Sequence, residues 1–263
     1  MNLYLGLKVY DDVCAERLAD AGYDGVILGD ILCNRRMFSY GSADMIQLAY
    51  ELSHTSLELI YQTPMYLTDR AFGNEVIRIE QLYSRSGVRK LLVQDHGLVQ
   101  WLTSNLPDVE IIWSRMGRNR NSLMNRIFVD FLKSSGVGAI ECDTPERVKA
   151  LSSSGMKVYG VYGALRYNTL SRECYQMYLN HRYDGICRRE CLSNDQHLTH
   201  GGFSMSIDGY MLGERKEYPD TKQLVDIVTA GSLNMMVYTD TLQQALRARK
   251  DIREAIRMRG DNR

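Results

Sequence analysis

The sequence is poor in proline and carries no excess charge of either sign. Of its 263 residues only 4 are proline, and 32 Lys and Arg balance 32 Asp and Glu. This balance excludes a whole-protein field that would attract nucleic acid or a membrane. No apolar run approaches the roughly 18 residues of a membrane helix, and the chain does not open on a basic segment followed by an apolar one. We therefore expect a cytoplasmic protein that does not associate with membranes, and nucleic acid is a poor fit as its partner.

Several catalytic signatures are also missing. The chain has no G-x-G-x-x-G after its first predicted strand, no G-x-S-x-G and no H-E-x-x-H. These absences argue against a dinucleotide-binding fold, a serine hydrolase and a zinc protease. Phenylalanine is scarce, at 5 residues against 17 tyrosines. Because tyrosine places a hydroxyl in apolar walls, the bias indicates either a cavity for a polar aromatic or oxygenated ligand or simple compositional drift.

Short apolar segments alternate with segments of helical period along the whole chain. The predicted strands are Leu3–Val9, Gly25–Gly29, Leu57–Gln62, Lys90–Gln94, Glu110–Ser114, Gly138–Cys142, Lys157–Gly160 and Val225–Thr229. The predicted helices are Asp11–Ala21, Ser42–Leu52, Asn74–Arg85, Leu98–Ser104, Ser122–Ser134, Pro145–Ser153 and Asp240–Met258. This alternation predicts an α/β protein, a TIM-type (β/α)8 barrel formed by residues 1–263 as one domain.

The regular spacing breaks once, between the seventh and eighth predicted strands. This insertion, Val161–Leu224, is neither rich in proline nor low in complexity, and loops of such length usually carry function. It contains a predicted hairpin, Phe203–Ile207 with Tyr210–Leu212, which turns at the strong turn dipeptide Asp208-Gly209.

Cysteines gather in the insertion. Cys174, Cys187 and Cys191 are spaced C-x12-C-x3-C, and Cys33 follows the second predicted strand. Since all loops that follow barrel strands lie on one face, these four thiolates are able to meet at one rim. Four cysteine ligands suit an iron–sulfur cluster or structural zinc, although zinc knuckles usually contain C-x2-C, which is absent here. Cysteines without a shared role are the third alternative.

The two remaining cysteines have simpler interpretations. Cys14 falls inside the first predicted helix, so we expect it in the core. Cys142 ends the sixth predicted strand, where it is either a packed residue at the top of the barrel or a reserve ligand or reactive thiol.

The cysteine-bearing segments resemble family U32, the collagenase-like peptidases. The likeness covers most of the chain and is strong only around the cysteines. The matching segments are the glycine-led loop from Tyr162 to Ser171-Arg172-Glu173-Cys174, the pair Cys187 and Cys191, Cys33 with Arg35-Arg36, the turn Asp95-His96-Gly97, the hairpin Asp208-Gly209-Tyr210 and the last strand Leu224–Val228. One departure lies after the sixth predicted strand, where Asp143 stands nearest to the family's glutamate.

This resemblance implies a TIM-type barrel with a 4Fe-4S cluster on Cys33, Cys174, Cys187 and Cys191. Members with known roles are mostly not proteases. They hydroxylate a quinone precursor without O₂, working with a second family member, or hydroxylate RNA bases, with prephenate as the oxygen donor. We therefore expect an oxygen-independent hydroxylase, or a subunit of one, acting on a small aromatic or carboxylated molecule. A non-catalytic iron–sulfur partner subunit and an RNA-base hydroxylase are the alternatives.

Arginines near the predicted rim are candidates for binding an anionic substrate. Arg35 and Arg166 are each expected near a strand end, and Arg115 opens a basic segment after the fifth predicted strand. Guanidinium groups bind carboxylates through two parallel hydrogen bonds and also balance the charge of a thiolate cluster. The alternative is that these arginines are solvated surface residues.

Three further residues are candidates for proton transfer. Asp95 and His96 end the fourth predicted strand, and Asp30 ends the second. A carboxylate and an imidazole at the barrel mouth are suited to acid–base catalysis. The alternative for the first pair is a turn-forming aspartate followed by an exposed histidine.

Overall fold

A computed structural model describes most of the chain. The described residues are 1–7, 14–29, 42–64, 67, 69–114, 125–142, 144–163, 165–170, 196–200, 203–208, 211–215, 221–230, 234–239 and 241–261.

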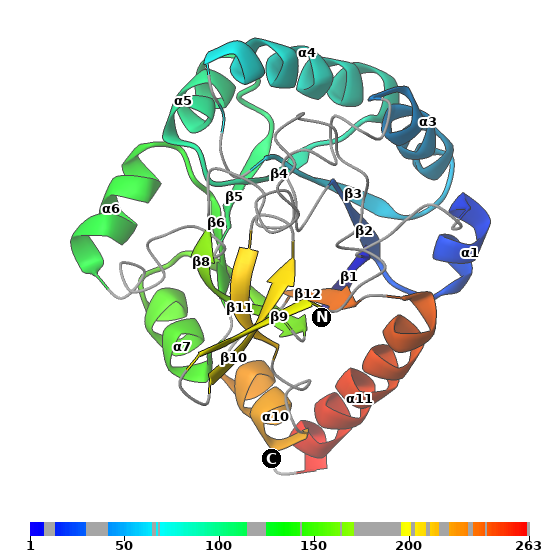
Figure 1. The fold of residues 1–263 in the computed structure, drawn as a ribbon, viewed down its shortest axis with the longest axis vertical. Coiled ribbons are helices and arrows are strands. Elements are labelled where there is room, and N and C mark those ends of the chain that lie inside the picture. The colour runs from blue at the N-terminus through cyan, green and yellow to red at the C-terminus, as the bar shows by residue number, and fades with distance from the viewer. Residues whose placement is uncertain are drawn as a thin grey trace.

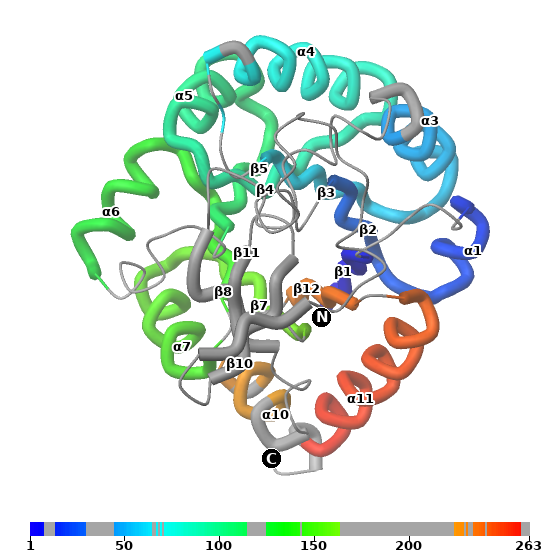
Figure 2. The backbone as a smooth tube through the Cα atoms, viewed as in Figure 1, coloured from blue at the N-terminus to red at the C-terminus, as the bar shows by residue number. Residues whose placement is uncertain are grey.

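Eight parallel strands form a closed barrel in the order β1-β12-β7-β6-β5-β4-β3-β2. They are β1 (Asn2–Leu7), β2 (Gly25–Leu28), β3 (Glu58–Gln62), β4 (Lys90–Val93), β5 (Glu110–Trp113), β6 (Ala139–Cys142), β7 (Lys157–Gly163) and β12 (Asn234–Thr239). The first and last of these strands pair along their whole length and so close the barrel (Figure 2). The predicted TIM-type fold is therefore confirmed.

Helices form a ring outside the strands (Figure 1). They are α1 (Ala15–Asp20), α3 (Ser42–Ser53), α4 (Asp69–Ser86), α5 (His96–Asn105), α6 (Arg126–Ser134), α7 (Pro145–Ser153), α10 (Thr221–Thr229) and α11 (Leu242–Asp261). Among these described helices, none combines the length and the apolar character that crossing a membrane requires. The expectation that Cys14 lies in the core is wrong. Cys14 is exposed and precedes α1 as its N-cap residue.

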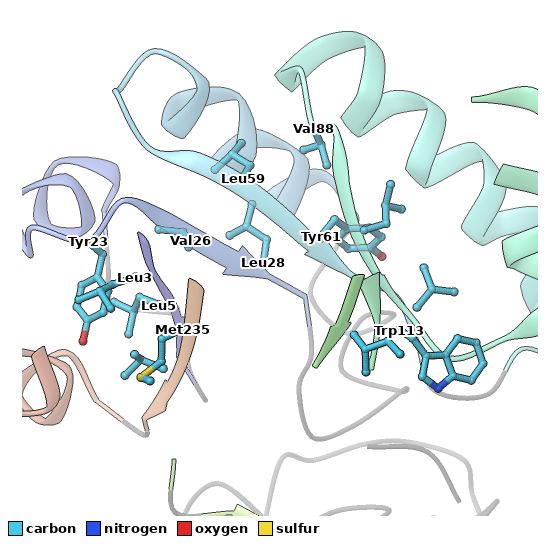
Figure 3. Packing of buried hydrophobic residues seen from close by; sticks show 14 of the residues in the cluster. Leu3, Leu5, Tyr23, Val26, Leu28, Leu59, Tyr61, Val88, Trp113 and Met235 are labelled. Atoms are coloured by element: carbon cyan, nitrogen blue, oxygen red, sulfur yellow. The ribbon is translucent and has the colours of Figure 1, made fainter. Parts of the chain in front are cut away.

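The barrel strands carry two apolar faces because successive side chains point to opposite sides of a strand. The inner face is filled by a cluster that includes Tyr4, Ile60 and Met236. The outer face packs under the helices in a larger cluster, and Figure 3 shows several of its members, including Leu59 and Val88, between strands and helices. Both faces are buried, so the strands read as continuous apolar runs in the sequence.

The eighth barrel strand is not the predicted one. Val225–Thr229 belongs to helix α10, and the strand is Asn234–Thr239. Leu224, Ile227 and Val228 are buried while Asp226 is exposed, a spacing of three and four residues that is helical. Three apolar residues in a window of five do not distinguish a buried strand from one face of a helix. The resemblance also implied that Leu224–Val228 is the last strand, and that assignment is wrong for the same reason.

The insertion between β7 and α10 contains a separate antiparallel sheet in the order β8-β11-β10-β9. Its strands are β8 (Leu165–Leu170), β9 (Gln196–His200), β10 (Phe203–Asp208) and β11 (Met211–Arg215). The pairing of β10 with β11 confirms the predicted hairpin. The predicted bounds Val161–Leu224 are too wide, because β7 runs on to Gly163 and α10 begins at Thr221.

Charged side chains occupy the N-terminal end of the barrel interior. The Lys90 Nζ atom lies 2.7 Å from Glu58 Oε2 and 3.7 Å from Glu110 Oε2, and the Lys157 Nζ atom lies 2.7 Å from Glu110 Oε1. The Tyr4 hydroxyl donates to Glu58 at 2.7 Å. These ion pairs lie next to the inner apolar cluster, at the N-terminal ends of the strands. TIM-barrel enzymes carry their active sites at the opposite end.

Candidate functional site

Most of the predicted site residues lie outside the described residues. These are Asp30, Cys33, Arg35, Arg115, Cys174, Cys187 and Cys191. Arg166 lies in β8, in register with Glu214 of β11. Within the part of the chain that the structure describes, no group of three or more His, Cys, Asp or Glu side chains is placed to hold a metal ion. The four-cysteine ligand set therefore stays a prediction.

Asp95 and His96 lie where β4 leads into helix α5. The Asp95 carboxylate accepts a hydrogen bond from the Leu98 backbone N–H at 2.9 Å, so this aspartate is the N-cap of α5. The His96 ring stacks on Trp113 with centroids 4.6 Å apart and meets Phe131 of α6 at 5.4 Å. Trp113 belongs to the outer cluster, so the structure groups His96 with the helix layer and not with the barrel interior.

A different polar group fills the inner face at the C-terminal end of the strands. We call it the mouth cluster, and it consists of Gln62, Gln94, Ser114, Glu141 and Tyr238. Gln62 ends β3, Gln94 and Ser114 directly follow β4 and β5, and the other two lie near the ends of β6 and β12. Each follows by two residues a member of the inner apolar cluster, which puts its side chain on the interior side.

Hydrogen bonds connect four of these five residues. The Gln94 Nε2 group donates to Ser114 Oγ at 3.0 Å, and the Ser114 hydroxyl donates to Glu141 Oε2 at 2.9 Å. From the other side the Tyr238 hydroxyl donates to Glu141 Oε1 at 2.6 Å. Both carboxylate oxygens of Glu141 therefore accept a hydroxyl hydrogen bond, which fixes the plane of the carboxylate.

Glu141 is completely buried, at 0% exposure, and Tyr238 and Ser114 are buried beside it. Taking a carboxylate out of water is costly, and hydroxyl donors at hydrogen-bonding distance offset part of that cost. A buried carboxyl group with a fixed orientation is suited to accepting or donating a proton. The mouth cluster therefore has the chemistry of an acid–base site at the end of the barrel where TIM-barrel enzymes carry theirs.

The strands β1, β2 and β7 contribute no side chain to the mouth cluster. Glycines stand at the inward positions of three strands. Gly6 of β1, Gly29 after β2 and Gly163 of β7 each follow a member of the inner apolar cluster by two residues. A Cβ atom on Gly163 would lie 2.9 Å from the backbone oxygen of Tyr238, so glycine is what allows β12 to bring its tyrosine this close. β12 lies between β1 and β7 in the barrel, so Gly6 and Gly163 flank Tyr238, with which both are in register.

The sequence contains a signal for Glu141. The strand Ala139-Ile140-Glu141-Cys142 holds one acidic residue in an otherwise apolar run, and that residue has the inward phase of Ala139. A carboxylate inside a buried strand is expected only where partners are provided for it. Cys142 has the opposite phase and is packed in the outer cluster, at 1% exposure, which confirms its interpretation as a packed residue.

The two segments that carry the predicted cysteine ligands start from the same end of the barrel. Cys33 follows β2, and Cys174, Cys187 and Cys191 lie between β8 and β9 in the insertion that follows β7. Because the barrel strands are parallel, the chain leaves β2 and β7 at one rim. The segments that carry these cysteines therefore begin at the same rim, and the ligand set stays a prediction.

Comparison with known proteins identifies the fold. No protein-family model and no curated protein sequence matches the chain. Among solved structures, the U32 peptidase Mk0906 is similar over 92% of this chain and 94% of its own, with 12% identity and a TM-score of 0.52. Orotidine 5'-monophosphate decarboxylase from Metallosphaera sedula is similar over 97% and 100%, with 11% identity and a TM-score of 0.52. Dihydropteroate synthase from Coxiella burnetii is similar over 98% and 93%, with 11% identity and a TM-score of 0.51. At these identities the likeness shows the TIM-barrel fold, which the U32 peptidase shares.

Proposed function

We propose that this protein is an enzyme that binds a small oxygen-bearing substrate at the C-terminal mouth of its barrel, with Glu141 as the proton-transferring group. The observation that carries the proposal is the buried Glu141 carboxylate, which accepts hydrogen bonds from Ser114 at 2.9 Å and from Tyr238 at 2.6 Å. A buried carboxylate can also have a purely structural role, and Glu75 is an example. It lies on helix α4, outside the barrel, where it pairs with Arg78 and accepts a hydrogen bond from the Tyr61 hydroxyl. Glu141 is instead at the end of the interior where substrates of TIM-barrel enzymes bind.

Each residue of the hydrogen-bonded group has a distinct role in this proposal. Glu141 accepts or donates the proton, and Tyr238 and Ser114 orient its carboxylate and stabilise the ionised form through their hydroxyls. Gln94 holds the Ser114 hydroxyl at 3.0 Å and is therefore a positioning residue. The inward glycines Gly6, Gly29 and Gly163 contribute no side chain that would compete with the substrate.

The finer proposal is a 4Fe-4S protein that resembles UbiV and catalyses an oxygen-independent hydroxylation. It is supported by the sequence motif around Cys33, Cys174, Cys187 and Cys191 and by the U32-like fold. A bound cluster would supply one-electron transfer. The three arginines, Arg35, Arg115 and Arg166, would bind a carboxylate of the substrate or of a prephenate-like oxygen donor. A second family member is the partner that this proposal implies.

The cofactor is tested by anaerobic purification and analysis of iron and sulfide. We expect a brown protein with about four iron and four sulfide per chain, and loss of both on Cys33→Ser or Cys187→Ser. Cys14→Ser is the matched control, because Cys14 is an exposed helix N-cap outside the proposed ligand set, and it should retain the iron. A colourless protein after anaerobic reconstitution, or one that holds zinc instead, contradicts the iron–sulfur proposal.

The acid–base role is tested with Glu141→Gln, which keeps the shape of the side chain and removes its proton-transfer capacity. The assay incubates the reconstituted protein anaerobically with prephenate and a panel of aromatic carboxylates and follows the addition of one oxygen atom by mass spectrometry. We expect turnover to fall about 10²–10⁴-fold. Full turnover by Glu141→Gln contradicts the role of this residue. Turnover that requires a second family member and is unchanged by Glu141→Gln assigns this chain to the non-catalytic partner-subunit alternative.

A further inference from the structure

Gln62 is the member of the mouth cluster that the hydrogen bonds described above leave out. It ends β3, and its side chain follows the inward phase of Ile60, whereas Tyr61 points outward and donates to Glu75 at 2.7 Å. Only 1% of Gln62 is exposed. Neither its Oε1 nor its Nε2 atom has a hydrogen-bond partner among the described residues.

A buried primary amide without partners is costly, because its donors and its acceptor have lost water and gained nothing. Native proteins keep few such groups, and a role in binding or catalysis is one of the established reasons for keeping one. Gln94 shows that the same side chain is easily satisfied in this layer, since its amide donates to Ser114 at 3.0 Å. The unsatisfied amide of Gln62 is therefore specific to its position.

The surroundings of Gln62 hold it in place. Gly29, with φ +120°, brings the end of the β2 segment so close that a Cβ atom there would lie 2.4 Å from the backbone oxygen of Gln62. On the other side, the Thr63 backbone N–H donates to the Leu92 oxygen of β4 at 3.0 Å. The backbone that carries the amide is thus fixed between two neighbouring strands, as is required of a group that recognises a ligand.

We propose that Gln62 is a specificity-determining residue whose amide binds a neutral, planar edge of the ligand that carries an adjacent donor and acceptor, as in a lactam or a carboxamide. Such an edge gives a hydrogen bond to Oε1 and accepts one from Nε2 at the same time. A carboxylate offers acceptors only and would leave Oε1 without a donor. The inference rests on the proposed function, because it takes the substrate to lie at the mouth cluster.

The first test compares the thermal stability of Gln62→Met with that of Gln94→Met. Methionine has a similar length and no polar group that needs a partner. We expect Gln62→Met to raise the Tm by about 2–8 °C, because two unsatisfied atoms leave the interior. Gln94→Met is the matched control in the same layer and should lower the Tm, since it removes a hydrogen bond that is made. A Gln62→Met protein that is less stable than wild type, or that does not fold, overturns the inference, because the amide is then structural.

The second test uses two small ligands that differ by one donor. 2-Pyridone carries adjacent carbonyl and N–H groups, and N-methyl-2-pyridone keeps the ring and the carbonyl but lacks the N–H. By ligand-observed NMR we expect wild type to bind 2-pyridone about three- to tenfold more tightly than the methylated ring, and Gln62→Met to lose this preference. Absence of the preference in wild type, or its persistence in Gln62→Met, overturns the proposal. Full turnover by Glu141→Gln would contradict the proposed catalysis but leave this binding result intact, so the two failures are distinguishable.

Discussion

Tyr238→Phe is the sharpest test of the mouth cluster, because it removes one oxygen atom and preserves the ring. In the structure that oxygen donates to Glu141 Oε1 at 2.6 Å, and both residues are at most 3% exposed. Phenylalanine would leave a buried carboxylate oxygen without this hydroxyl donor.

The magnitude follows from the kind of hydrogen bond. A hydrogen bond to a charged group contributes about 1.5–3 kcal/mol, more than a bond between neutral groups. For a chain of this size each kcal/mol changes the Tm by about 2–4 °C, so we expect Tyr238→Phe to lower the Tm by about 3–12 °C.

The assay is thermal unfolding followed by circular dichroism, with Tyr159→Phe as control. Tyr159 is also buried inside the barrel, but its hydroxyl lies 3.4 Å from Glu110 Oε1, which is a long hydrogen bond at the opposite end. The control should therefore lose less than about 1 kcal/mol. In a Glu141→Gln background the effect of Tyr238→Phe should shrink, since the acceptor is no longer a carboxylate. An equal loss in the two phenylalanine variants, or no coupling to Glu141, would refute the reasoning.

Three further predictions concern other parts of the barrel. Burial alone would raise the pKa of Glu58, but hydrogen bonds from Lys90 and Tyr4 hold that pKa below its ordinary value of 4.5. The stability that this carboxylate contributes is therefore present above pH 4.5 and is lost as the pH falls through the folded-state pKa. Lys90→Met should weaken this loss of stability in acid, which denaturant titrations at several pH values would measure. Arg78→Met should cost about 3–5 kcal/mol in urea unfolding, because it leaves the Glu75 carboxylate buried without its cation. A second substitution Glu75→Gln should restore part of the loss, because it removes the buried charge and keeps an acceptor for the Tyr61 hydroxyl. Gly163→Ala should cost about 1–3 kcal/mol by the same measurement, because its Cβ would press on the backbone oxygen of the facing tyrosine; unchanged stability would show that β7 and β12 separate easily.

The barrel was predictable because its signals are local and repeated. Each short apolar run followed by a helical period predicts one strand–helix unit, and helix α7 begins at Pro145 and ends at Ser153 as predicted. The prediction failed at Val225–Thr229, where a short apolar window was compatible with either period. Only the burial of Leu224, Ile227 and Val228 on one side of α10 distinguishes the helix from a strand. The true strand, Asn234–Thr239, is buried along its whole length.

The candidate site was less predictable, because a site depends on direction as well as on position. Asp95 and His96 follow β4 as expected, yet Asp95 turns back to cap α5 and His96 stacks on Trp113 in the outer layer. Gln94 and Ser114, one residue past their strands, still follow the alternation of those strands. At Asp95 and His96 the chain has turned into helix α5, so strand phase no longer sets the direction of their side chains. The direction of Glu141 is set by strand phase, and it could have been inferred from Ala139.

By itself the sequence determined the alternation of strands and helices, the parallel barrel that follows from it, and the hairpin of the insertion, because these depend on hydrophobic period and turn residues within a few positions. Only the tertiary structure decided that Glu141, Ser114 and Tyr238 form one hydrogen-bonded group and that the amide of Gln62 is buried at the end of β3 without a described partner. Those hydrogen bonds join the ends of β5 and β6 to β12, which lies about a hundred residues further along the chain. Closure of the barrel sets which of their side chains meet, and no local pattern encodes that register.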